Sequence, residues 1–344
     1  MNVLLITAKK AAVVGGIAVW TEHYLSQCEQ HDLHCTLVNT EKGTEKTFGG
    51  VFSEITRTQR ITKDLKQALK NGHYDIVHLN TSCGPFGLFR DYAMAKKLKK
   101  KGIPIVTHYH CDIPQWINNG LRRRTVKKLA QISCLNLVLC ENSRVYLEQF
   151  GIDAVKVPNF IKEEVVSDHP KTIRDVLTRI FFVGRVSEPK GAAEMYELAK
   201  RFPDKTFALA GGVVPPVDTW EKPDNLRLLG RISSPKVMEI LDDADLFLFP
   251  SHSEGFSIAL MEAMARGVPC LAYETVGANS DMLAEDCGVT VPYGDVDALE
   301  RAIRALEDPA KRQTISQNAN RRVRNQYTTD AVLSLFKSLY QSKL

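Results

Sequence analysis

Two glutamates eight positions apart, Glu254 and Glu262, are the side chains of this sequence best suited to hold a polar ligand. Glu254 lies in a loop after an apolar run of strand length, residues 245–249, and Glu262 lies about two turns into the helical pattern that follows. At 100° per residue this spacing leaves the two side chains about 80° apart around a helix axis, so both could line one site. The amides of Gly255 and Phe256 come at the helix start, where free N–H groups and the helix dipole favour anions and hydroxyl oxygens.

A carboxylate pair beside free amides suits a sugar nucleotide, which offers several hydroxyls and a diphosphate. The same spacing also fits a glutamate that caps the helix and a second one that is merely solvated, and spacing alone leaves both interpretations open. Strand, loop, helix and strand follow one another over residues 245–273. This order predicts a parallel α/β sheet, in which ligands bind beyond the carboxyl ends of the strands.

Residues 251–269 have the pattern Ser-x-x-Glu-Gly-Phe-x-x-x-x-x-Glu-Ala-Met-Ala-x-Gly-x-Pro. This pattern resembles the signature of retaining GT-B glycosyltransferases, specifically glycosyltransferase family 4 (glycosyl transferases group 1). The resemblance implies an α/β protein of two Rossmann-like α/β/α domains that face a central cleft. It also implies transfer of a hexosyl group from a nucleotide-diphosphate sugar to a hydroxyl, with retention of anomeric configuration.

The resemblance assigns a donor site to named positions. Arg185 and Lys190 match the basic pair of the family's diphosphate clamp, where a guanidinium fork and an ammonium would stabilise the leaving diphosphate. Glu254 would hold the donor sugar, and Glu262 would accept hydrogen bonds from ribose hydroxyls. The predicted catalytic residues are Glu254, His110, Arg185 and Lys190. The predicted donor and nucleotide ligands are Gly16, Arg185, Lys190, Arg231, Ile232, Glu254, Gly255, Phe256, Ser257 and Glu262.

Residues 103–113 contain a predicted strand that delivers residues 107–112 to a carboxyl edge of the sheet, where ligands bind. By resemblance, His110 matches the active-site histidine of the family's Thr-x-x-His-x-Asp-Ile pattern. His108 is a register-shifted alternative, because alternate residues of a strand face the same side. Gly15 and Gly16 precede a predicted helix but lack the G-x-G-x-x-G fingerprint of a dinucleotide site. Such a pair also makes an ordinary tight turn.

With 344 residues, 44% apolar and 25% charged, the chain has the composition of a globular protein of two domains. By resemblance, residues 1–165 would bind the acceptor and residues 166–327 the nucleotide sugar. A helix over 328–344 would cross back onto the first domain. Residues 41–60 are polar and rich in glycine and threonine, which predicts a mobile loop.

The eight cysteines include no C-x-x-C pair, so the sequence predicts neither a disulfide framework nor a zinc site, and no metal cofactor is expected. No run approaches the roughly 18 apolar residues of a membrane span. The chain begins directly with a strand-like run rather than a secretory leader, which predicts a cytoplasmic protein.

Residues 1–165 hold 23 Lys and Arg against 15 Asp and Glu, which predicts an anionic partner for this half. A basic amphipathic helix is expected over residues 121–132. It could lie on the inner face of the cell membrane, or it could be a domain helix with a solvated basic face. Nucleic acid is not favoured, because the basic excess lacks interleaved aromatic residues. The predicted acceptor or membrane face is Arg122, Arg123, Arg124, Lys127 and Lys128.

The predicted activity is hexosyl transfer from a nucleotide-diphosphate sugar, with UDP as the expected nucleotide, to a glycan or lipid-linked acceptor in surface polysaccharide biosynthesis. Two alternatives share the same phosphate clamp. A GT-B nucleotide-sugar epimerase would need acid and base residues at sugar C2 and would form product without an acceptor. A non-enzymatic nucleotide-sugar binding protein would bind the donor and never release nucleotide.

Overall fold

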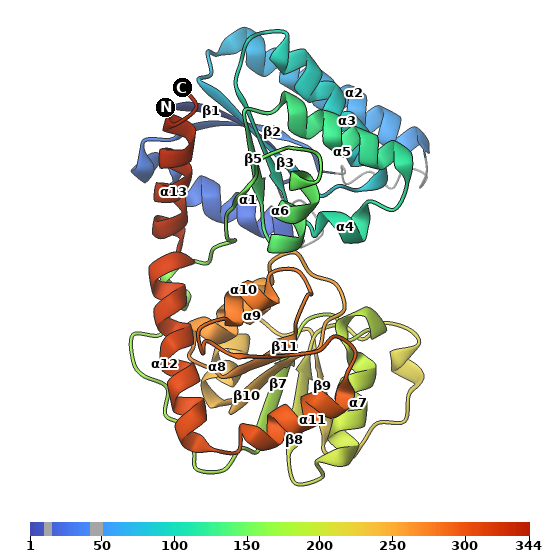
Figure 1. Cartoon of the computed structure of the whole chain (residues 1–344), viewed down its shortest axis with the longest axis vertical. Helices are drawn as coiled ribbons and strands as arrows, with labels where there is room; N and C mark the ends of the chain where they lie inside the picture. Colours follow the sequence, from blue (N-terminus) through green and yellow to red (C-terminus); the bar gives the residue numbers. More distant parts are fainter. Residues whose placement is uncertain (10–15, 42–50) are drawn as a thin grey trace. The chain divides into compact units, whose positions relative to one another are not determined.

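The computed structural model describes residues 1–9, 16–41 and 51–344, and these form two compact units (Figure 1). The first unit is Met1–Phe160 together with Thr329–Leu344, and the second is Ile161–Thr328. Each unit contains one six-stranded sheet in which every neighbouring pair of strands is parallel. The predicted architecture of two Rossmann-like α/β/α domains is thereby confirmed.

The first sheet has the strand order β2-β1-β3-β4-β5-β6. Its strands are β1 (Asn2–Thr7), β2 (His34–Asn39), β3 (Ile76–Thr81), β4 (Ile105–Tyr109), β5 (Leu135–Val138) and β6 (Val155–Lys156). The helices of this unit are α1 (Gly16–Gln27), α2 (Val51–Asn71), α3 (Pro85–Lys99), α4 (Ile113–Trp116), α5 (Gly120–Ile132), α6 (Glu141–Glu148) and α13 (Thr329–Gln341). Every residue of β3 and β4 is buried, as expected for central parallel strands covered by helices on both faces.

Two hydrophobic cores flank this sheet. One lies under α2, α3 and α5, and the other lies under α1 and α13. Phe336 and Tyr340 of α13 pack into the second core beside Trp20 and Tyr24 of α1. The last helix of the chain is therefore an integral part of the first unit.

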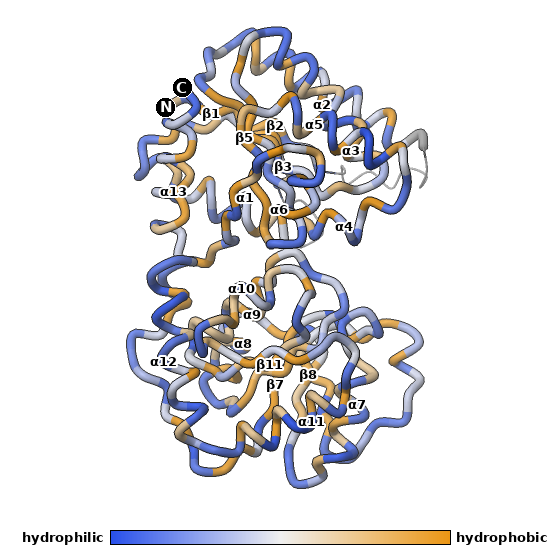
Figure 2. The backbone as a smooth tube through the Cα atoms, in the orientation of Figure 1, coloured by the Kyte–Doolittle hydropathy of each residue, from blue (hydrophilic) through white to orange (hydrophobic). Residues whose placement is uncertain are grey.

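The second sheet has the order β12-β11-β10-β7-β8-β9. Its strands are β7 (Arg179–Val183), β8 (Thr206–Ala210), β9 (Leu226–Gly230), β10 (Leu246–Phe249), β11 (Cys270–Tyr273) and β12 (Val289–Val291). The helices of this unit are α7 (Ala192–Arg201), α8 (Ser234–Asp243), α9 (Ile258–Ala265), α10 (Asn279–Leu283), α11 (Val296–Ala305) and α12 (Pro309–Gln326). Figure 2 shows largely apolar strands in both sheets, whereas α12 is largely hydrophilic.

The loop predicted over residues 41–60 is wrong from Val51 onward, because α2 begins there. Ile61 and Leu65 of this helix are buried against the sheet, four positions apart. The first turns of α2 carry mostly polar side chains, so the helical period becomes visible only further along. Residues 42–50 of the predicted loop lie outside the described part of the chain.

Candidate active site

The predicted diphosphate clamp and the loop of Glu254 lie at the carboxyl ends of β7 and β10, which are hydrogen-bonded neighbours in the second sheet. Lys190 Nζ lies 2.5 Å from Glu254 Oε1. The same ammonium donates to the carbonyl oxygen of Ser253 at 3.1 Å, and Ser251 Oγ donates to Glu254 Oε1 at 2.9 Å. Two predicted catalytic residues, 64 positions apart in the sequence, therefore form an ion pair.

This ion pair is only partly solvated, with side-chain exposures of 21% for Lys190 and 14% for Glu254. An anion that reaches Lys190 must therefore share the ammonium with Glu254 or displace it. An ammonium has three hydrogens to donate, so Lys190 can hold the carboxylate, the Ser253 carbonyl and one further acceptor at the same time. The pair is suited to a ligand that brings both a negative group and a hydroxyl.

The backbone joins the two loops closely. Gly191 has φ +80°, and a Cβ at this position would lie 2.3 Å from the carbonyl oxygen of Pro250. Only glycine fits this position, because the left-handed conformation and the contact both exclude a side chain. The amide of His252 also donates to the carbonyl oxygen of Pro189 at 3.0 Å. The clamp loop is thus fixed against the residues that lead to Glu254.

A third loop supports Glu254 from the end of β11. The amide of Ala278 donates to the carbonyl oxygen of Gly255 at 2.9 Å. Gly277 has φ +53°, and a Cβ there would lie 2.5 Å from the same oxygen. This loop therefore packs directly on the backbone of the predicted donor-sugar site.

The structure limits how Phe256 and Ser257 can act at the helix start. Ser257 is the N-cap of α9, and its Oγ accepts a hydrogen bond from the Leu260 amide at 3.2 Å. Phe256 is buried with its ring edge-on to Tyr327 at 5.3 Å. Their side chains are occupied within the fold, so a ligand role for these two residues would rest on their backbone groups.

Glu262 lies on α9 and is half-buried. Burial raises the pKa of its carboxyl from 4.5 to about 7, and no residue in the described part of the chain forms an ion pair with it. A carboxyl that titrates near pH 7 can accept a hydrogen bond from a hydroxyl when ionised and donate one when protonated.

Arg185 and Arg231 both extend into solvent at the carboxyl edge of the second sheet, after β7 and β9. The Nε atom of Arg231 would lie 3.3 Å from a Cβ on Gly212, so this guanidinium lies over a glycine at the end of β8. Neither arginine has a hydrogen-bond or ion-pair partner among the described residues, and both are open to an anion. Ile232 follows Arg231 and is half-buried.

Sequence reasoning missed a triad that supports the same loop. His252 Nε2 lies 2.6 Å from Glu194 Oε1, and the hydroxyl of Tyr293 lies 3.1 Å from His252 Nδ1. Glu194 comes from the first turn of α7 and Tyr293 follows β12. The position of His252 two residues before Glu254 is the one signal in the sequence that could have indicated this role.

In the first unit, His110 directly follows β4, and its amide donates to the carbonyl oxygen of Thr81 at 2.8 Å. Its ring lies 5.2 Å from the ring of Trp20 and 4.0 Å from that of His108. Burial, with a smaller effect of His78, lowers the pKa of His110 to about 3, so its imidazole is neutral. His110 keeps some solvent exposure while His108 is fully buried, which favours His110 over His108 as a ligand.

Gly16 is the first residue of α1 and is exposed, with no atom within 4 Å of a Cβ built on it. Crowding in the described structure therefore does not explain a glycine at this position. Gly15, the other residue of the predicted glycine pair, lies outside the described residues.

The assignment of Arg122 to an exposed basic face is wrong. Its side chain is buried, and it donates to the carbonyl oxygen of Cys83 at 2.5 Å and to Asn118 Oδ1 at 3.2 Å. Leu121, an apolar residue of the amphipathic helix expected over residues 121–132, is 65% exposed. The helix is rotated relative to the prediction, because long-range packing against α3 decides which side is covered. Arg123, Arg124 and Lys128 are exposed, and Lys127 is half-buried.

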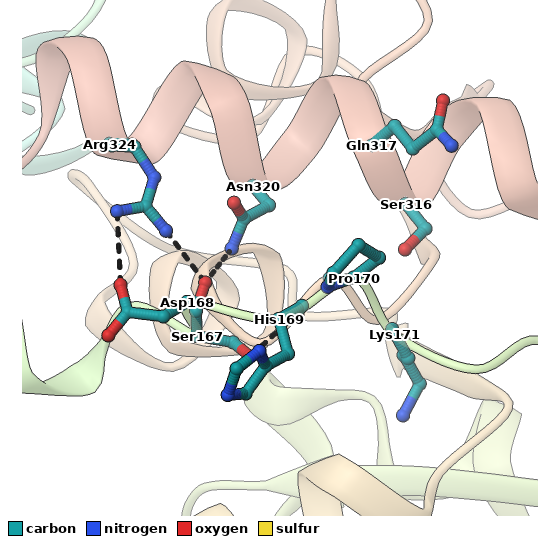
Figure 3. A pocket seen from close by; sticks show the side chains of 10 residues that line it. Ser167, Asp168, His169, Pro170, Lys171, Ser316, Gln317, Asn320 and Arg324 are labelled. Carbon is teal, nitrogen blue, oxygen red and sulfur yellow. Dashed lines mark hydrogen bonds and ion pairs between the residues drawn. The ribbon is translucent and has the colours of Figure 1, made fainter.

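A cavity of about 320 Å³ lies in the second unit between residues 167–171 and α12 (Figure 3). It lies beside Gly267, which precedes β11, and so at the sheet edge opposite the clamp. Its polar groups pair with one another: Arg324 contacts Asp168 at 3.3 Å, and Asn320 Nδ2 donates to the carbonyl oxygen of Ser167 at 3.2 Å. Its place in the fold separates it from the candidate site.

Among the residues that the structure describes, no group of three or more His, Cys, Asp or Glu side chains is arranged to hold a metal ion. Within the same residues, no helix is both long enough and apolar enough to cross a bilayer.

Comparison with known proteins agrees with this architecture. Residues 14–165 match the family model described as Glycosyltransferase Family 4, and residues 169–322 match Glycosyl transferases group 1. The chain is 26% identical over 327 residues to a phosphatidyl-myo-inositol mannosyltransferase of Mycolicibacterium smegmatis, covering 89% of this chain and 81% of that one. It is 24% identical over 327 residues to a UDP-Gal:alpha-D-GlcNAc-diphosphoundecaprenol alpha-1,3-galactosyltransferase of Escherichia coli, covering 83% and 81%.

Among solved structures, sucrose-phosphate synthase from Thermosynechococcus elongatus superposes with a TM-score of 0.81 at 17% identity, covering 99% of this chain and 98% of that one. Matches to both family models and this superposition over nearly the whole chain define the class: the protein is a GT-B glycosyltransferase, and therefore a transferase enzyme. Its first half carries the family 4 segment of that class and its second half the group 1 segment.

Proposed function

We propose that this protein is a retaining glycosyltransferase that moves a hexosyl group from a nucleotide-diphosphate sugar to a hydroxyl of a glycan or lipid-linked acceptor. The observation that carries the proposal is the contact of 2.5 Å between Lys190 and Glu254, with Ser251 on the same carboxylate oxygen. This ion pair places a cation for the diphosphate beside a carboxylate for the sugar. Arg185, which has no partner among the described residues, follows β7, the strand next to β10.

In the proposed reaction, the bond between the anomeric carbon and the diphosphate oxygen breaks, and a new bond forms from that carbon to the acceptor oxygen. Arg185 and Lys190 stabilise the negative charge that grows on the leaving diphosphate. The acceptor hydroxyl gives its proton to the departing phosphate, so the products are the glycoside and the nucleoside diphosphate. This route needs no separate base from the protein.

The remaining predicted residues hold the donor. Glu254 binds a sugar hydroxyl and lies near the positive charge that develops on the ring. Glu262 binds the ribose hydroxyls, and the neutral imidazole of His110 accepts or donates one hydrogen bond to the donor sugar. The loop that contains Arg231 and Ile232 holds the base. Gly16 and the backbone of residues 255–257 complete the donor site.

The finer parts of the proposal rest on relatives. The Escherichia coli enzyme uses, by its name, a UDP-sugar and a lipid diphosphate acceptor, and the mycobacterial enzyme acts on a phosphatidylinositol. These support UDP as the nucleotide, a lipid-linked acceptor and a role in surface polysaccharide assembly at the inner face of the cell membrane. An epimerase or a binding protein is not favoured, since the two relatives named above are a mannosyltransferase and a galactosyltransferase.

The direct test is release of nucleotide from UDP-, GDP- and ADP-sugars, first alone and then with candidate acceptors, for the wild type and for Glu254→Gln. We expect slow release from one donor, faster release with an acceptor, and loss of both in the variant. The anomeric configuration of the product, measured by proton NMR, tests retention. No binding of any donor would overturn the proposal, and product formed from the donor sugar without an acceptor would point to the epimerase.

A further inference from the structure

Four exposed apolar side chains lie at the starts of α3 and α5 and at the end of the short helix α4 between them, all in the first unit. Phe86 and Phe89 lie in the first turns of α3 and are 53% and 38% exposed. Trp116, the last residue of α4, is 46% exposed, and Leu121, in the first turn of α5, is 65% exposed. The described part of the chain has four exposed aromatic side chains of large size. Three of them belong to this group, and the fourth is Tyr293.

These side chains lie at the same edge of the sheet. α3 follows β3, and α4 and α5 follow β4, the parallel neighbour of β3, so all three helices start beyond the carboxyl ends of adjacent strands. α3 packs along α5. The hydrogen bond of 2.5 Å from Arg122 to the carbonyl oxygen of Cys83 brings the first turn of α5 against the residue before the cap of α3.

Cations follow the apolar side chains on the outer sides of the same helices. On α5, Leu121, Arg124 and Lys128 are exposed and fall within about 60° of one another around the helix axis. α3 has the same order of side chains: exposed Phe86 and Phe89 lie in its first turns, and lysines lie at its end. The exposed cations over residues 85–132 are Lys96, Lys97, Lys99, Lys100, Lys101, Arg123, Arg124 and Lys128.

No acidic side chain of residues 85–132 is exposed. Residues 85–132 contain two acidic residues, Asp91 and Asp112, and both are buried. Asp91 pairs with Arg90 at 3.1 Å, and Asp112 accepts a hydrogen bond from Asn142 at 3.1 Å. The exposed formal charges of this segment are therefore all positive.

We propose that this α3–α4–α5 surface docks on an anionic lipid bilayer, with Phe86, Phe89, Trp116 and Leu121 at the level of the headgroups. Aromatic rings with one wet and one apolar side suit the bilayer interface, and clustered Lys and Arg are attracted to anionic lipid. The inference rests on the proposed function and deepens it: the acceptor is a membrane lipid, presented at the edge of the first sheet where His110 follows β4.

The arrangement fits a bilayer better than a nucleic acid. Aromatic residues that stack on bases alternate with cations along a binding groove. Here the apolar side chains lie on α4 and in the first turns of α3 and α5, and the cations lie further along α3 and α5. Leu121, the most exposed of the four, is aliphatic and offers no face for stacking.

Binding to vesicles of phosphatidylcholine, with and without phosphatidylglycerol, tests the proposal by co-sedimentation and by tryptophan fluorescence. Trp116 is the natural probe, because Trp20 is buried and Trp220 packs edge-on against Tyr196 in the second unit. We expect binding only with phosphatidylglycerol, a blue shift of the emission, and quenching by brominated acyl chains. Trp116→Phe should abolish the spectral change while much of the binding remains.

Paired variants separate this surface from general effects. Leu121→Ser should weaken vesicle binding about tenfold, whereas Val176→Ser in the second unit, at a nearly equal exposure of 64%, should leave it unchanged. Arg124→Gln with Lys128→Gln should also weaken binding, and Lys200→Gln with Lys311→Gln, two exposed lysines of the second unit, should not. Nucleotide release from the donor in solution should stay at the wild-type rate in Leu121→Ser and in the two second-unit controls.

The outcomes distinguish this inference from the proposed function. Normal nucleotide release without vesicle binding would overturn the docking surface and leave the transferase assignment intact. Equal losses in Leu121→Ser and Val176→Ser, or binding to single-stranded oligonucleotides in place of vesicles, would also overturn it. Vesicle binding that depends on these residues in a protein that binds no nucleotide sugar would keep the docking surface and remove the proposed reaction.

Discussion

The hydroxyl of Tyr340 lies 2.5 Å from Nδ1 of His78, which joins the last helix of the chain to a central strand 262 positions earlier. The contact is one link of a buried chain that runs across the first unit. His78 Nε2 lies 2.9 Å from Asn80 Oδ1, and Asn80 Nδ2 donates to Thr7 Oγ1 at 2.9 Å. Thr7 Oγ1 lies 2.8 Å from Thr21 Oγ1.

The hydrogen bonds of this buried network all run in the same direction from donor to acceptor. Thr21 Oγ1 donates to the carbonyl oxygen of Ile17, so the hydroxyl hydrogen of Thr7 must go to Thr21. Asn80 Oδ1 can only accept, so His78 carries its proton on Nε2 and accepts from Tyr340 through Nδ1. The hydroxyl of Tyr24 in α1 lies 3.2 Å from that of Tyr340 and donates to it, because the hydrogen of Tyr340 goes to His78. The network thus starts at Tyr24, passes through α13 and ends at the first turn of α1, one residue after Gly16.

Tyr340→Phe should therefore destabilise the first unit by about 1–3 kcal/mol, because it leaves His78 Nδ1 buried without a donor. Urea unfolding followed by circular dichroism measures this loss. Tyr293→Phe, which removes an exposed hydroxyl in the second unit, is the control and should cost much less. Equal stability of Tyr340→Phe and the wild type would mean that Tyr340 does not donate a hydrogen bond to His78.

The stability of the first unit should fall as the pH drops below about 6.5. Burial lowers the pKa of His78 and of His110 to about 3, and it lowers that of His108 well below 6.5. In this window the unfolded chain binds protons that the folded chain does not, so stability decreases toward acid. Each such histidine contributes up to about 1.4 kcal/mol per pH unit.

Denaturation at a series of pH values between 7.5 and 5 measures this slope. His108→Phe should reduce it, because one buried imidazole no longer titrates in the unfolded chain. Val176→Ser, at an exposed position of the second unit, removes no titratable group and should leave the slope unchanged. A slope that is the same in His108→Phe and the wild type would contradict the prediction.

Glu254→Gln should lower kcat/KM for the preferred donor by about 10²–10³, the usual effect of removing one electrostatic contact to a transition state. Lys190→Met should have a comparable effect. The fold-loss of kcat/KM in the double variant should be smaller than the product of the two single fold-losses, because the residues act as one ion pair. Turnover within about twofold of the wild type in Glu254→Gln would refute the assignment.

Nucleotide affinity should rise with pH around pH 7 if Glu262 holds the ribose. Its pKa is raised to about 7, and the ionised form is the better acceptor for two hydroxyl donors. Calorimetry with UDP between pH 6 and 8 should show this rise in the wild type and not in Glu262→Gln. Glu221→Gln, at an exposed position of the same unit, should behave like the wild type.

The same pKa shift has an effect of opposite sign on folding. The folded protein holds a proton on Glu262 that the unfolded chain releases above about pH 4.5. Stability from this group is thus present at low pH and is lost as the pH rises toward 7. Glu262→Gln should remove this loss from the stability of the second unit.

Gly191→Ala should disrupt the clamp loop, because a methyl group would meet the carbonyl oxygen of Pro250 at 2.3 Å in a left-handed backbone conformation. We expect a lower melting temperature and a donor KM raised at least about tenfold. Gly294→Ala is an apt comparison: it also has positive φ but nothing within 4 Å, so its effect should be smaller. Equal effects of the two substitutions would show that the contact with Pro250 does not matter.

Local patterns in the sequence predicted a parallel α/β sheet, and the resemblance carried by residues 251–269 implied two such domains. Parallel strands buried on both faces appear as short, continuous apolar runs, and the helices between them keep their own period, so the type of sheet could be predicted before any contact was known. The spacing of the site residues was likewise visible. Arg185, Lys190 and Glu254 lie a few residues after a strand, where ligands bind in such sheets, and Glu262 lies about two turns into the helix after Glu254.

Tertiary structure alone decided which side chains meet. The Lys190–Glu254 pair forms because β7 and β10 are neighbours in the sheet, and the Tyr340–His78 contact forms because α13 packs on the first unit. Arg122 was assigned to the wrong face, since its buried position depends on a carbonyl 39 residues away. Periodicity sets which residues share a side of a helix, but only the packing of distant elements determines which side is covered.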